Sequence, residues 1–430
     1  RPYEVRNNAG SAMRDVYVIG AFTTPFGRFH NRSYKDLTRE AYLGAIADAG
    51  IDKGEGIEFA YFTNCGMWVD NQACIRGQVC FTPLVREGLF PERVPMINVE
   101  GGCSSGQMAL HSAWKDILSG QSEMTLAIGV EKLYNPDHPE KTMNAYKAGI
   151  DNFDVADWED YYTKAAAKGG VKFEPGPNRT IFMDTYALQA AYHMKKYGST
   201  QRQFAIAAAK NHANGAKNPK SQYKFNLTPE QVLADRAVTF PFTRAMCAPV
   251  GDGAAALVLC SAEKLADMPA PVRERAVKVK ASAMTGGKFR DLDEPGLSQL
   301  AAKKAYAMAG VKPSDIDLAE VHDATSFCEV YQAEMLGFCD EGQGGRLVEA
   351  GETAIGGRIP INTSGGLVSK GHPVGATGLS MLAELSTQLR GEAGERQVKG
   401  AALALAENAG GVIGFDEAAC SVVILEKPGA

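Results

Sequence analysis

The stretch that decides the fold is residues 94–106, Val-Pro-Met-Ile-Asn-Val-Glu-Gly-Gly-Cys-Ser-Ser-Gly. A run typical of a buried strand leads directly into a glycine-rich turn, and a helical pattern follows from Gln107 to Leu118. A strand, a tight turn and a helix in immediate succession are typical of α/β proteins. Ligand sites in such proteins form where the strands end, so this turn is the first place to look for chemistry.

A related stretch occurs in the second half of the chain. Asn98-x-x-Gly-Gly is matched by Asn362-x-x-Gly-Gly, and Asp252-Gly-Ala-Ala-Ala-Leu-Val-Leu is matched by Glu417-Ala-Ala-Cys-Ser-Val-Val-Ile-Leu. The chain is therefore a duplication in which the first half is longer by about 98 residues. The spacing places the extra residues between about 131 and 251, where an insertion is expected to shape a ligand site.

Alternating apolar runs and helical patterns extend this arrangement over the whole chain. Because strands that are buried on both faces read as continuous apolar runs, these runs predict a largely parallel sheet. The expected strands are 16–20, 59–62, 94–99, 124–130, 277–283, 316–321, 359–362, 401–406 and 420–425. The expected helices are 37–49, 107–118, 182–196, 201–214, 297–309, one that ends at 335, and 375–389.

Length and charge exclude several classes of protein. A chain of 430 residues is too long for one ordinary core and needs two packed units or one unit with a large insertion. Its net charge of −5 provides no global positive field, so we expect no nucleic-acid partner. No apolar run reaches the roughly 18–20 residues that span a bilayer. Residues 1–13 lack an apolar signal core and residues 426–430 lack a targeting signal, so we expect a cytoplasmic protein.

The nine cysteines do not form a recognisable framework. Their number is odd and no pair has Cys-x-x-Cys spacing, so we expect neither disulfides nor a metal site. Most should be small buried hydrophobic residues.

Cys103 differs because it lies where a strand meets a helix and is flanked by Gly101, Gly102 and Gly106. A thiol at a helix N-terminus is expected to have a lowered pKa, and the backbone N–H groups of the same turn can bind an oxyanion. The alternative is a glycine-rich turn that merely contains a buried cysteine.

Two histidines follow strand ends in the second half. His372 lies in Gly371-His-Pro-Val-Gly-Ala-Thr-Gly, the counterpart of the Cys103 turn, and His322 lies in His322-Asp-Ala-Thr-Ser-Phe. If the halves are related by pseudo-symmetry, these turns meet at one end of the sheets. A cysteine and a histidine in contact are the minimum for nucleophilic thiol catalysis.

Together these motifs resemble the thiolases. The resemblance rests on the Cys103, His322, Asn362 and His372 segments and on Ala248-Pro-Val-Gly-Asp-Gly-Ala-Ala-Ala, and it extends over 16–427. It is nearest to sterol-carrier-protein-type thiolases and to bacterial acetyl-CoA acetyltransferase-like proteins.

The resemblance implies a duplicated thiolase fold, an α/β architecture with a five-layer αβαβα core and a large loop-domain insertion in the first half. The halves would be 14–130 with 245–270 and 271–430, and the insertion would be 131–244. It also implies catalytic roles for Cys103 as nucleophile, His372 as its activator and His322 as an oxyanion donor. The backbone N–H groups of Cys103 and Gly410 would form a second oxyanion hole.

The sequence departs from the family pattern at its second thiol. Ala324 stands where the sterol-carrier branch has cysteine, and the turn Glu407-Asn408-Ala409-Gly410 contains none where other thiolases have one. The acid/base thiol is therefore missing from both places. His322 is the leading substitute, because an imidazole titrates near neutral pH, and Glu407 and Cys328 are the alternatives.

The implied activity is that of a thiolase-type acyltransferase, which cleaves a 3-oxoacyl-CoA with CoA, or forms one by Claisen condensation, through an acyl-cysteine intermediate. CoA would be a substrate, with no permanently bound cofactor. A homodimer is expected, with a small zinc-ribbon/OB-fold protein as a further partner. The alternatives are an acyltransferase that uses a non-CoA acceptor, a thiolase-like retro-aldolase and a non-catalytic lipid carrier or scaffold subunit.

The acyl group cannot be derived from sequence. Aromatic residues of the insertion either line a pocket for a bulky or aromatic acyl group or form the insertion's own core. They are Tyr134, Tyr146, Phe153, Tyr161, Tyr162, Phe173, Phe182 and Tyr186.

Overall fold

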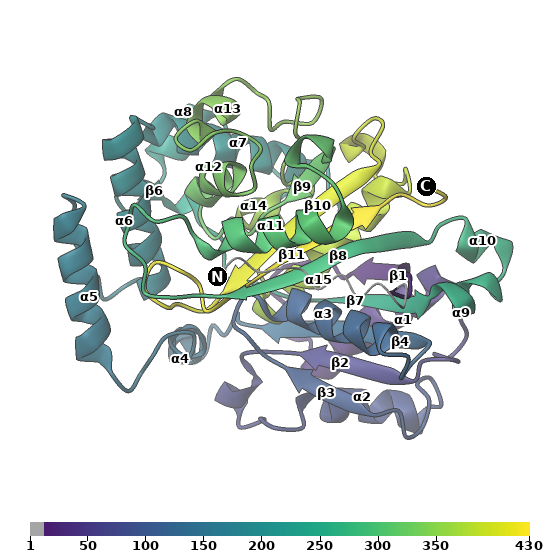
Figure 1. Cartoon of the computed structure of the whole chain (residues 1–430). Helices are drawn as coiled ribbons and strands as arrows, with labels where there is room; N and C mark the ends of the chain where they lie inside the picture. The colour runs from purple at the N-terminus through teal and green to yellow at the C-terminus, as the bar shows by residue number, and fades with distance from the viewer. Residues whose placement is uncertain (1–12) are drawn as a thin grey trace.

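The computed structural model describes residues 13–430, so the polar stretch 1–12 lies outside the described residues. Its framework is a sheet of nine strands in the order β3-β2-β4-β7-β1-β8-β11-β10-β9 (Figure 1). The first-half strands are β1 (Val16–Thr23), β2 (Phe59–Thr63), β3 (Met96–Val99), β4 (Met124–Lys132) and β7 (Asp252–Ser261). The second-half strands are β8 (Val277–Gly286), β9 (Leu318–Glu320), β10 (Leu403–Gly410) and β11 (Ala419–Glu426).

The expectation of a largely parallel sheet is wrong. Among the strands of the described sheet, only β2–β3, β2–β4 and β9–β10 are parallel pairs, whereas β1, β7, β8 and β11 pair antiparallel with their neighbours. A strand that is buried on both faces reads as a continuous apolar run whether it is parallel or antiparallel to its neighbours. Such a run therefore does not indicate the direction of the strand. The two halves meet where Tyr17 and Val18 of β1 pair with Lys278 and Val277 of β8.

The first-half strands and the second-half strands of this sheet form two β layers, one on each side of the central helices. With the helices outside them, five layers result, as the family resemblance implied. One outer layer covers the first half and consists of α1 (Tyr34–Ala49) and α2 (Arg76–Arg86). The central layer consists of α3 (Ser105–Leu118) and α15 (Val374–Leu389), which contact each other and strands of both halves. The other outer layer has α11 (Leu297–Ala309) on β8 and β11, with α12 (Ser326–Met335) beside it.

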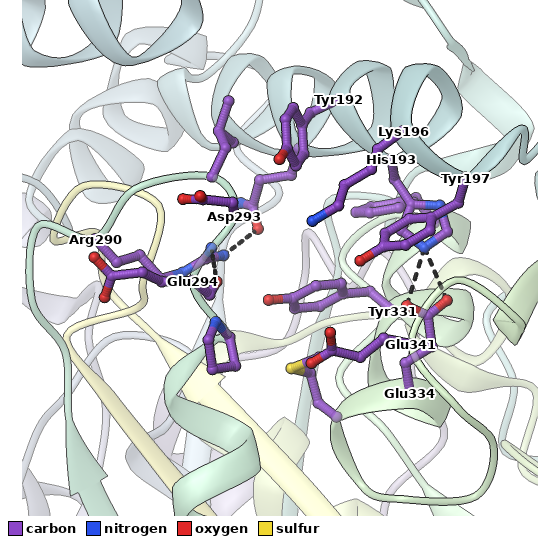
Figure 2. Close-up of a pocket in the computed structure, with 15 residues that line it drawn as sticks. Tyr192, His193, Lys196, Tyr197, Arg290, Asp293, Glu294, Tyr331, Glu334 and Glu341 are labelled. Carbon is purple, nitrogen blue, oxygen red and sulfur yellow. Dashed lines mark hydrogen bonds and ion pairs between the residues drawn. The ribbon is translucent and has the colours of Figure 1, made fainter. Parts of the chain in front are cut away.

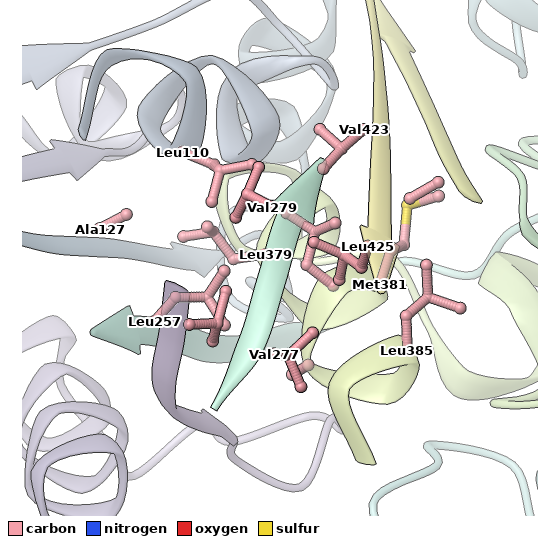
Figure 3. Packing of buried hydrophobic residues seen from close by; sticks show 14 of the residues in the cluster. Leu110, Ala127, Leu257, Val277, Val279, Leu379, Met381, Leu385, Val423 and Leu425 are labelled. Carbon is pink, nitrogen blue, oxygen red and sulfur yellow. The ribbon is translucent and has the colours of Figure 1, made fainter. Parts of the chain in front are cut away.

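The core explains why the central helices hold the halves together. Leu110 of α3 and Leu379 and Leu385 of α15 pack between Leu257 of β7 and Val423 of β11 in one buried cluster (Figure 3). Separate clusters lie under the two outer helical layers. Burying apolar surface on both faces of these helices is the dominant favourable contribution to this arrangement.

The connection between β4 and β7 is long and helical, whereas residues 411–418 suffice to connect β10 and β11. Figure 1 shows its helix α5 standing well apart from the sheet. Helix α6 of the same connection contacts the second half, where His193 Nε2 lies 2.8 Å from Glu334 Oε2 of α12 beside a small cavity (Figure 2). The connection contains α4 (Pro139–Lys147), α5 (Val155–Lys168), α6 (Ile181–Tyr197), α7 (Gln201–Ala216), α8 (Pro229–Ala234) and the hairpin β5 (Ala237–Thr239) with β6 (Phe242–Thr243). The exact domain division at 131–244 stays a prediction.

The remaining elements are short. They are the helices α9 (Ala262–Ala266), α10 (Ala270–Arg273), α13 (Gly344–Glu349) and α14 (Gly366–Lys370) and the 3-10 helices η1 (Met67–Asp70), η2 (Arg244–Met246), η3 (Pro313–Asp315) and η4 (Gly394–Arg396). The strand expected at 359–362 reduces to one bridge between Ile361 and Ala319. Within residues 13–430, no helix combines the length and the apolar character that a membrane crossing requires.

Candidate active site

Cys103 lies just before the N-terminus of α3, in a turn with no room for a side chain at Gly102, because a Cβ there would lie 2.7 Å from the Gly411 nitrogen. Gly102 has φ 58°, which is the left-handed region that other residues rarely adopt. A Cβ on Gly410 of β10 would lie 2.2 Å from the Cys103 nitrogen. The end of β10 therefore presses directly against the Cys103 turn, and Asn408 fixes it there by donating to the Cys103 carbonyl at 2.8 Å.

His372 comes from the second half and reaches the same point. It follows Gly371, which has φ 114°, and precedes α15. Its Nε2 lies 3.1 Å from Cys103 Sγ. Because α3 and α15 pack together as the central layer, the two turns at their N-termini meet, as the duplication predicted.

Thr377 decides which tautomer His372 adopts. The Thr377 hydroxyl donates to the Pro373 carbonyl at 3.1 Å, so its oxygen accepts at 2.6 Å from His372 Nδ1. With the proton on Nδ1, Nε2 has a lone pair that faces the Cys103 thiol. His372 is thus arranged to accept the thiol proton, in the way a general base activates a nucleophile.

His322 completes the group. Its ring centroid lies 5.0 Å from that of His372, and both ring nitrogens are buried without a hydrogen-bond partner in the described chain. Its backbone N–H donates to Glu407 Oε2 at 2.9 Å. Because an unpaired buried ring nitrogen is costly, its presence beside the nucleophile indicates a group that a substrate would satisfy.

Burial keeps all three groups neutral. It raises the pKa of the Cys103 thiol to about 12, with contributions from the charges of Glu417 and Glu131. It lowers the pKa of His322 to about 4 and holds that of His372 well below its usual range, helped by His322 and Lys370. The sequence predicts a lowered thiol pKa, which is wrong because burial outweighs the effect of the helix N-terminus.

The three candidates for the missing acid/base group differ in access. His322 lines the cavity at Cys103 together with Ala324. Glu407 and Cys328 are not among the described residues that line it. The Glu407 carboxylate accepts a hydrogen bond from the backbone N–H of His322, and burial raises the pKa of Glu407 to about 8. Cys328 Sγ lies 3.5 Å from the Thr325 hydroxyl.

The cavity at Cys103 has a volume of about 300 Å³ and opens between the second-half turns and the long connection. Three of the eight aromatic residues singled out in the sequence line it, namely Tyr146, Phe182 and Tyr186. Tyr162 packs with Tyr161 and Phe173 in a cluster that also contains Val412 and Phe415 of the second half. The aromatic residues therefore divide between the cavity lining and a core that the connection shares with the second half.

A larger neighbouring cavity of about 710 Å³ shares Cys247 and Ala248 with the first. It is lined by Arg28, Arg244 and the near-parallel rings of His212 and Phe225, whose centroids lie 5.5 Å apart. Cationic groups and flat aromatic faces are the features that bind phosphates and nucleobases.

Metal binding is chemically conceivable at only one cluster of the described residues. The donor atoms of Cys103, His322 and His372 lie within 4.8 Å of one another. They are the same groups that a thiol acyltransferase needs, and the expectation of no metal stays a prediction.

Comparison with known proteins decides the family. Residues 16–240 match the model "Thiolase, N-terminal domain", and residues 283–427 match "Thiolase C-terminal domain-like". The chain belongs to the thiolase family. The resemblance drawn from the sequence is therefore confirmed.

Curated relatives agree over most of this thiolase chain. An acetyl-CoA acetyltransferase of Methanothermobacter thermautotrophicus is 38% identical, covering 94% of this chain and 98% of the relative. Human sterol carrier protein 2 is 35% identical over 96% of this chain and 74% of the relative. A benzoylsuccinyl-CoA thiolase subunit of Thauera aromatica is 28% identical over 90% and 92%. The thiolase is thus an acyltransferase, as expected, of a family that uses CoA thioesters.

Solved structures confirm the fold. A structure titled "Ltp2-ChsH2(DUF35) aldolase" superposes with a TM-score of 0.76 at 22% identity, covering 98% of this thiolase and all of that chain. The acetyl-CoA acetyltransferase of Syntrophomonas wolfei superposes with a TM-score of 0.65 at 21% identity, covering 96% and 99%.

Reasoning from sequence missed the residues that support the reactive groups. Thr377 lies in the quoted Gly371–Gly378 motif and Asn408 in the turn examined for a second cysteine, so both were in view without a role. Tyr186 was seen only as an aromatic residue of the connection. Its hydroxyl donates to Glu417 Oε1 at 3.0 Å. The two residues lie far apart in the sequence, so no local pattern predicts this contact.

Proposed function

We propose that this thiolase cleaves a 3-oxoacyl-CoA with a bulky or aromatic acyl group, using CoA, or runs the reverse condensation. The observation that carries the proposal is the 3.1 Å contact between Cys103 Sγ and His372 Nε2, at a cavity with room for a large acyl group. A thiol and a neutral imidazole in contact are the requirement for forming an acyl-cysteine.

The lining of the Cys103 cavity supports a bulky acyl group. Tyr146, Phe182 and the two methionines Met143 and Met183 provide flat and adaptable apolar surface. The name of the Thauera aromatica relative refers to a benzoylsuccinyl thioester, which has an aromatic acyl group. We infer an acyl group of comparable bulk for this enzyme.

The neighbouring 710 Å³ cavity is the proposed site of CoA. Arg28 and Arg244 would bind phosphates, and the rings of His212 and Phe225 would stack on the base. The shared residues Cys247 and Ala248 mark where the thiol arm would enter the Cys103 cavity. Arg244 also donates to Asp235 at 2.8 Å, so a phosphate must compete with that carboxylate.

The proposed cleavage has two stages. His372 Nε2 takes the Cys103 proton as the sulfur attacks the keto carbon, and His322 donates a hydrogen bond to the oxygen that becomes negative. Carbon–carbon cleavage leaves an acyl-Cys103, which the thiolate of CoA then attacks. The backbone N–H groups of Cys103 and Gly410 would stabilise the oxyanion of this second stage.

Two measurements test the proposal. Acyl-CoA should leave a mass adduct on Cys103 that the Cys103→Ala variant lacks, and thiolysis should be fastest with aryl or branched 3-oxoacyl-CoAs. A retro-aldolase or a non-catalytic carrier would form no adduct, and an acyltransferase with a non-CoA acceptor would form the adduct without cleaving any 3-oxoacyl-CoA by thiolysis. A preference for acetoacetyl-CoA over every bulky substrate would refute the acyl assignment.

Assembly is the remaining part of the proposal. We infer a homodimer, as the family resemblance implies. We also infer a small zinc-ribbon/OB-fold partner, which is supported by the relative named as a subunit and by the structural neighbour with DUF35 in its title. Light scattering of the purified protein measures its mass directly. A monomer that is fully active without any added protein would contradict both parts.

A further inference from the structure

The chemistry proposed above lacks one group. When the carbon–carbon bond breaks, the α-carbon of the departing acyl-CoA must receive a proton. Both thiols that serve elsewhere in the family are replaced, by Ala324 and by the Glu407–Gly410 turn. Burial leaves His322 uncharged, and the proton that His372 takes from Cys103 is needed later by the released Cys103 thiolate, so neither imidazole has a proton for the α-carbon.

A tyrosine at the cavity wall is hydrogen-bonded to a carboxyl group that lies behind it. Tyr186 of α6 lines the cavity with Cys103 and His322, and only 8% of its surface is exposed. Its hydroxyl donates to Glu417 Oε1 at 3.0 Å. Glu417 is close enough to Cys103 for its charge to raise the thiol pKa, although Glu417 does not itself line the cavity.

We propose that Tyr186 and Glu417 form a proton relay that protonates the departing enolate during cleavage and removes the α-proton of the acyl-CoA during condensation. This inference rests on the proposed thiolase reaction and supplies the step that its missing thiol would have performed. Tyr186 lines the cavity at Cys103 and is the catalytic residue of the pair, and Glu417 acts through it. Burial and the charge of Glu417 hold the pKa of Tyr186 well above its usual range, so Tyr186 passes on a proton from Glu417 and does not rest as a tyrosinate.

The protons balance over a full turnover. Cys103 gives its proton to His372, its sulfur bonds to the keto carbon, and the breaking carbon–carbon bond leaves its electron pair on the α-carbon. That carbon takes the Tyr186 proton, and Tyr186 takes the carboxyl proton of Glu417. CoA gives up its thiol proton to solvent and its thiolate takes the acyl group, while the released Cys103 thiolate recovers its proton from His372. Glu417 regains one proton from solvent through Tyr186, which closes the balance.

The surroundings of Glu417 suit a group that must exist in both protonation states near neutral pH. Burial and the adjacent Asp416 raise its pKa to about 7, while Tyr186 and Arg290 act in the opposite direction. Arg290 is itself held by Asp416 at 2.9 Å, which limits its pull on Glu417. The other titratable groups that face Glu417 are Tyr162, Tyr331, Glu407 and the thiols of Cys103, Cys328 and Cys420.

Exchange of α-hydrogen isolates this step from acyl transfer. The full-length protein is incubated in D₂O with acetyl-CoA or succinyl-CoA, and deuterium uptake into the acyl group is followed by mass spectrometry. Tyr186→Phe and Glu417→Gln should each slow uptake at least ~100-fold, the usual contribution of a positioned acid or base. The matched control is Tyr192→Phe, which removes a hydroxyl from the same helix outside the Cys103 cavity and should exchange at the wild-type rate.

Two further readouts separate chemistry from structural support. Both variants should still form the Cys103 adduct with acyl-CoA, which also shows that they are folded. Wild-type exchange should increase with pH through about 7, because the carboxylate of Glu417 is the base, and Glu417→Asp should retain a weaker form of this increase.

Four results would overturn the relay. They are wild-type exchange in Tyr186→Phe, an unchanged pH profile in Glu417→Gln, loss of the Cys103 adduct together with exchange, and no exchange in a wild-type protein that forms the adduct. A wild-type protein that forms no adduct contradicts the proposed function itself, which keeps the two failures distinct.

Discussion

Replacing Thr377 by valine tests whether this residue holds His372 in its reactive tautomer. The change keeps the shape of the buried side chain and removes the oxygen that accepts from His372 Nδ1 at 2.6 Å. Leaving that N–H buried and unpaired costs about 1–3 kcal/mol. The proton then favours Nε2, where it faces Cys103 and blocks transfer from the thiol. Since about 1.4 kcal/mol corresponds to a tenfold change in population, the reactive tautomer should become roughly 5–150-fold rarer.

The assay is the rate at which iodoacetamide alkylates Cys103 at neutral pH, followed by mass spectrometry. Thr377→Val should slow alkylation by that factor, and His372→Ala sets the lower limit. Thr377→Ser keeps the hydroxyl and is the matched control, expected within about threefold of wild type if the hydroxyl acts through the Nδ1 hydrogen bond. Alkylation of Thr377→Val at the wild-type rate, or equal impairment of the serine and valine variants, would refute the tautomer argument.

Three further perturbations address the remaining parts of the site. Cys103→Ser should abolish acyl transfer while circular dichroism stays unchanged, because losing a covalent nucleophile costs several kcal/mol of barrier, and near-normal turnover would remove Cys103 from that role. His322→Ala should lower turnover about 10²–10³-fold through loss of an oxyanion donor, whereas Ala324→Cys in the same turn should remain active, and steady-state rates that reverse this order would contradict it. Exchanging residues 131–251 for the segment of a short-chain relative should move the substrate preference toward smaller acyl groups in a thiolysis panel, and a folded chimera with unaltered preference would show that specificity lies elsewhere.

Much of the fold could be predicted because the chain repeats itself. The match between the Asn98 and Asn362 segments places two strand–turn–helix units in equivalent positions, and the helices that follow them form the shared central layer. Strand direction was not predictable from the same data. The run in β7 is apolar throughout because it is buried on both faces, and an antiparallel strand meets that description as well as a parallel one.

Some residues of the candidate site could be predicted from the sequence and others could not. Cys103 and His372 could be predicted because each lies in a turn whose glycines are visible in the sequence. The contact of Tyr186 with Glu417 could not, because it joins the long connection to the segment before the last strand. The sequence predicts a lowered pKa for the Cys103 thiol, whereas burial raises it. The position at a helix N-terminus can be predicted from sequence, but the degree of burial cannot.

Because Cys103 and His372 are buried, the thiol is deprotonated only as it attacks the substrate. With the Cys103 pKa raised to about 12 and the His372 pKa well below its usual range, a resting thiolate–imidazolium pair is disfavoured, so both groups stay neutral across the neutral range. Charge separates only when the attacked carbonyl oxygen can share it, because the backbone N–H groups of Cys103 and Gly410 stabilise that oxygen only once it becomes negative. Acylation of Cys103 should therefore show no pH dependence across the neutral range, and its rate should decrease only in acid, where His372 begins to be protonated. Rapid-quench measurements of adduct formation with acyl-CoA test this, and an increase in rate between about pH 6 and 9, the behaviour of an ordinary thiol with a pKa near 8.5, would show that the thiolate forms before the substrate arrives.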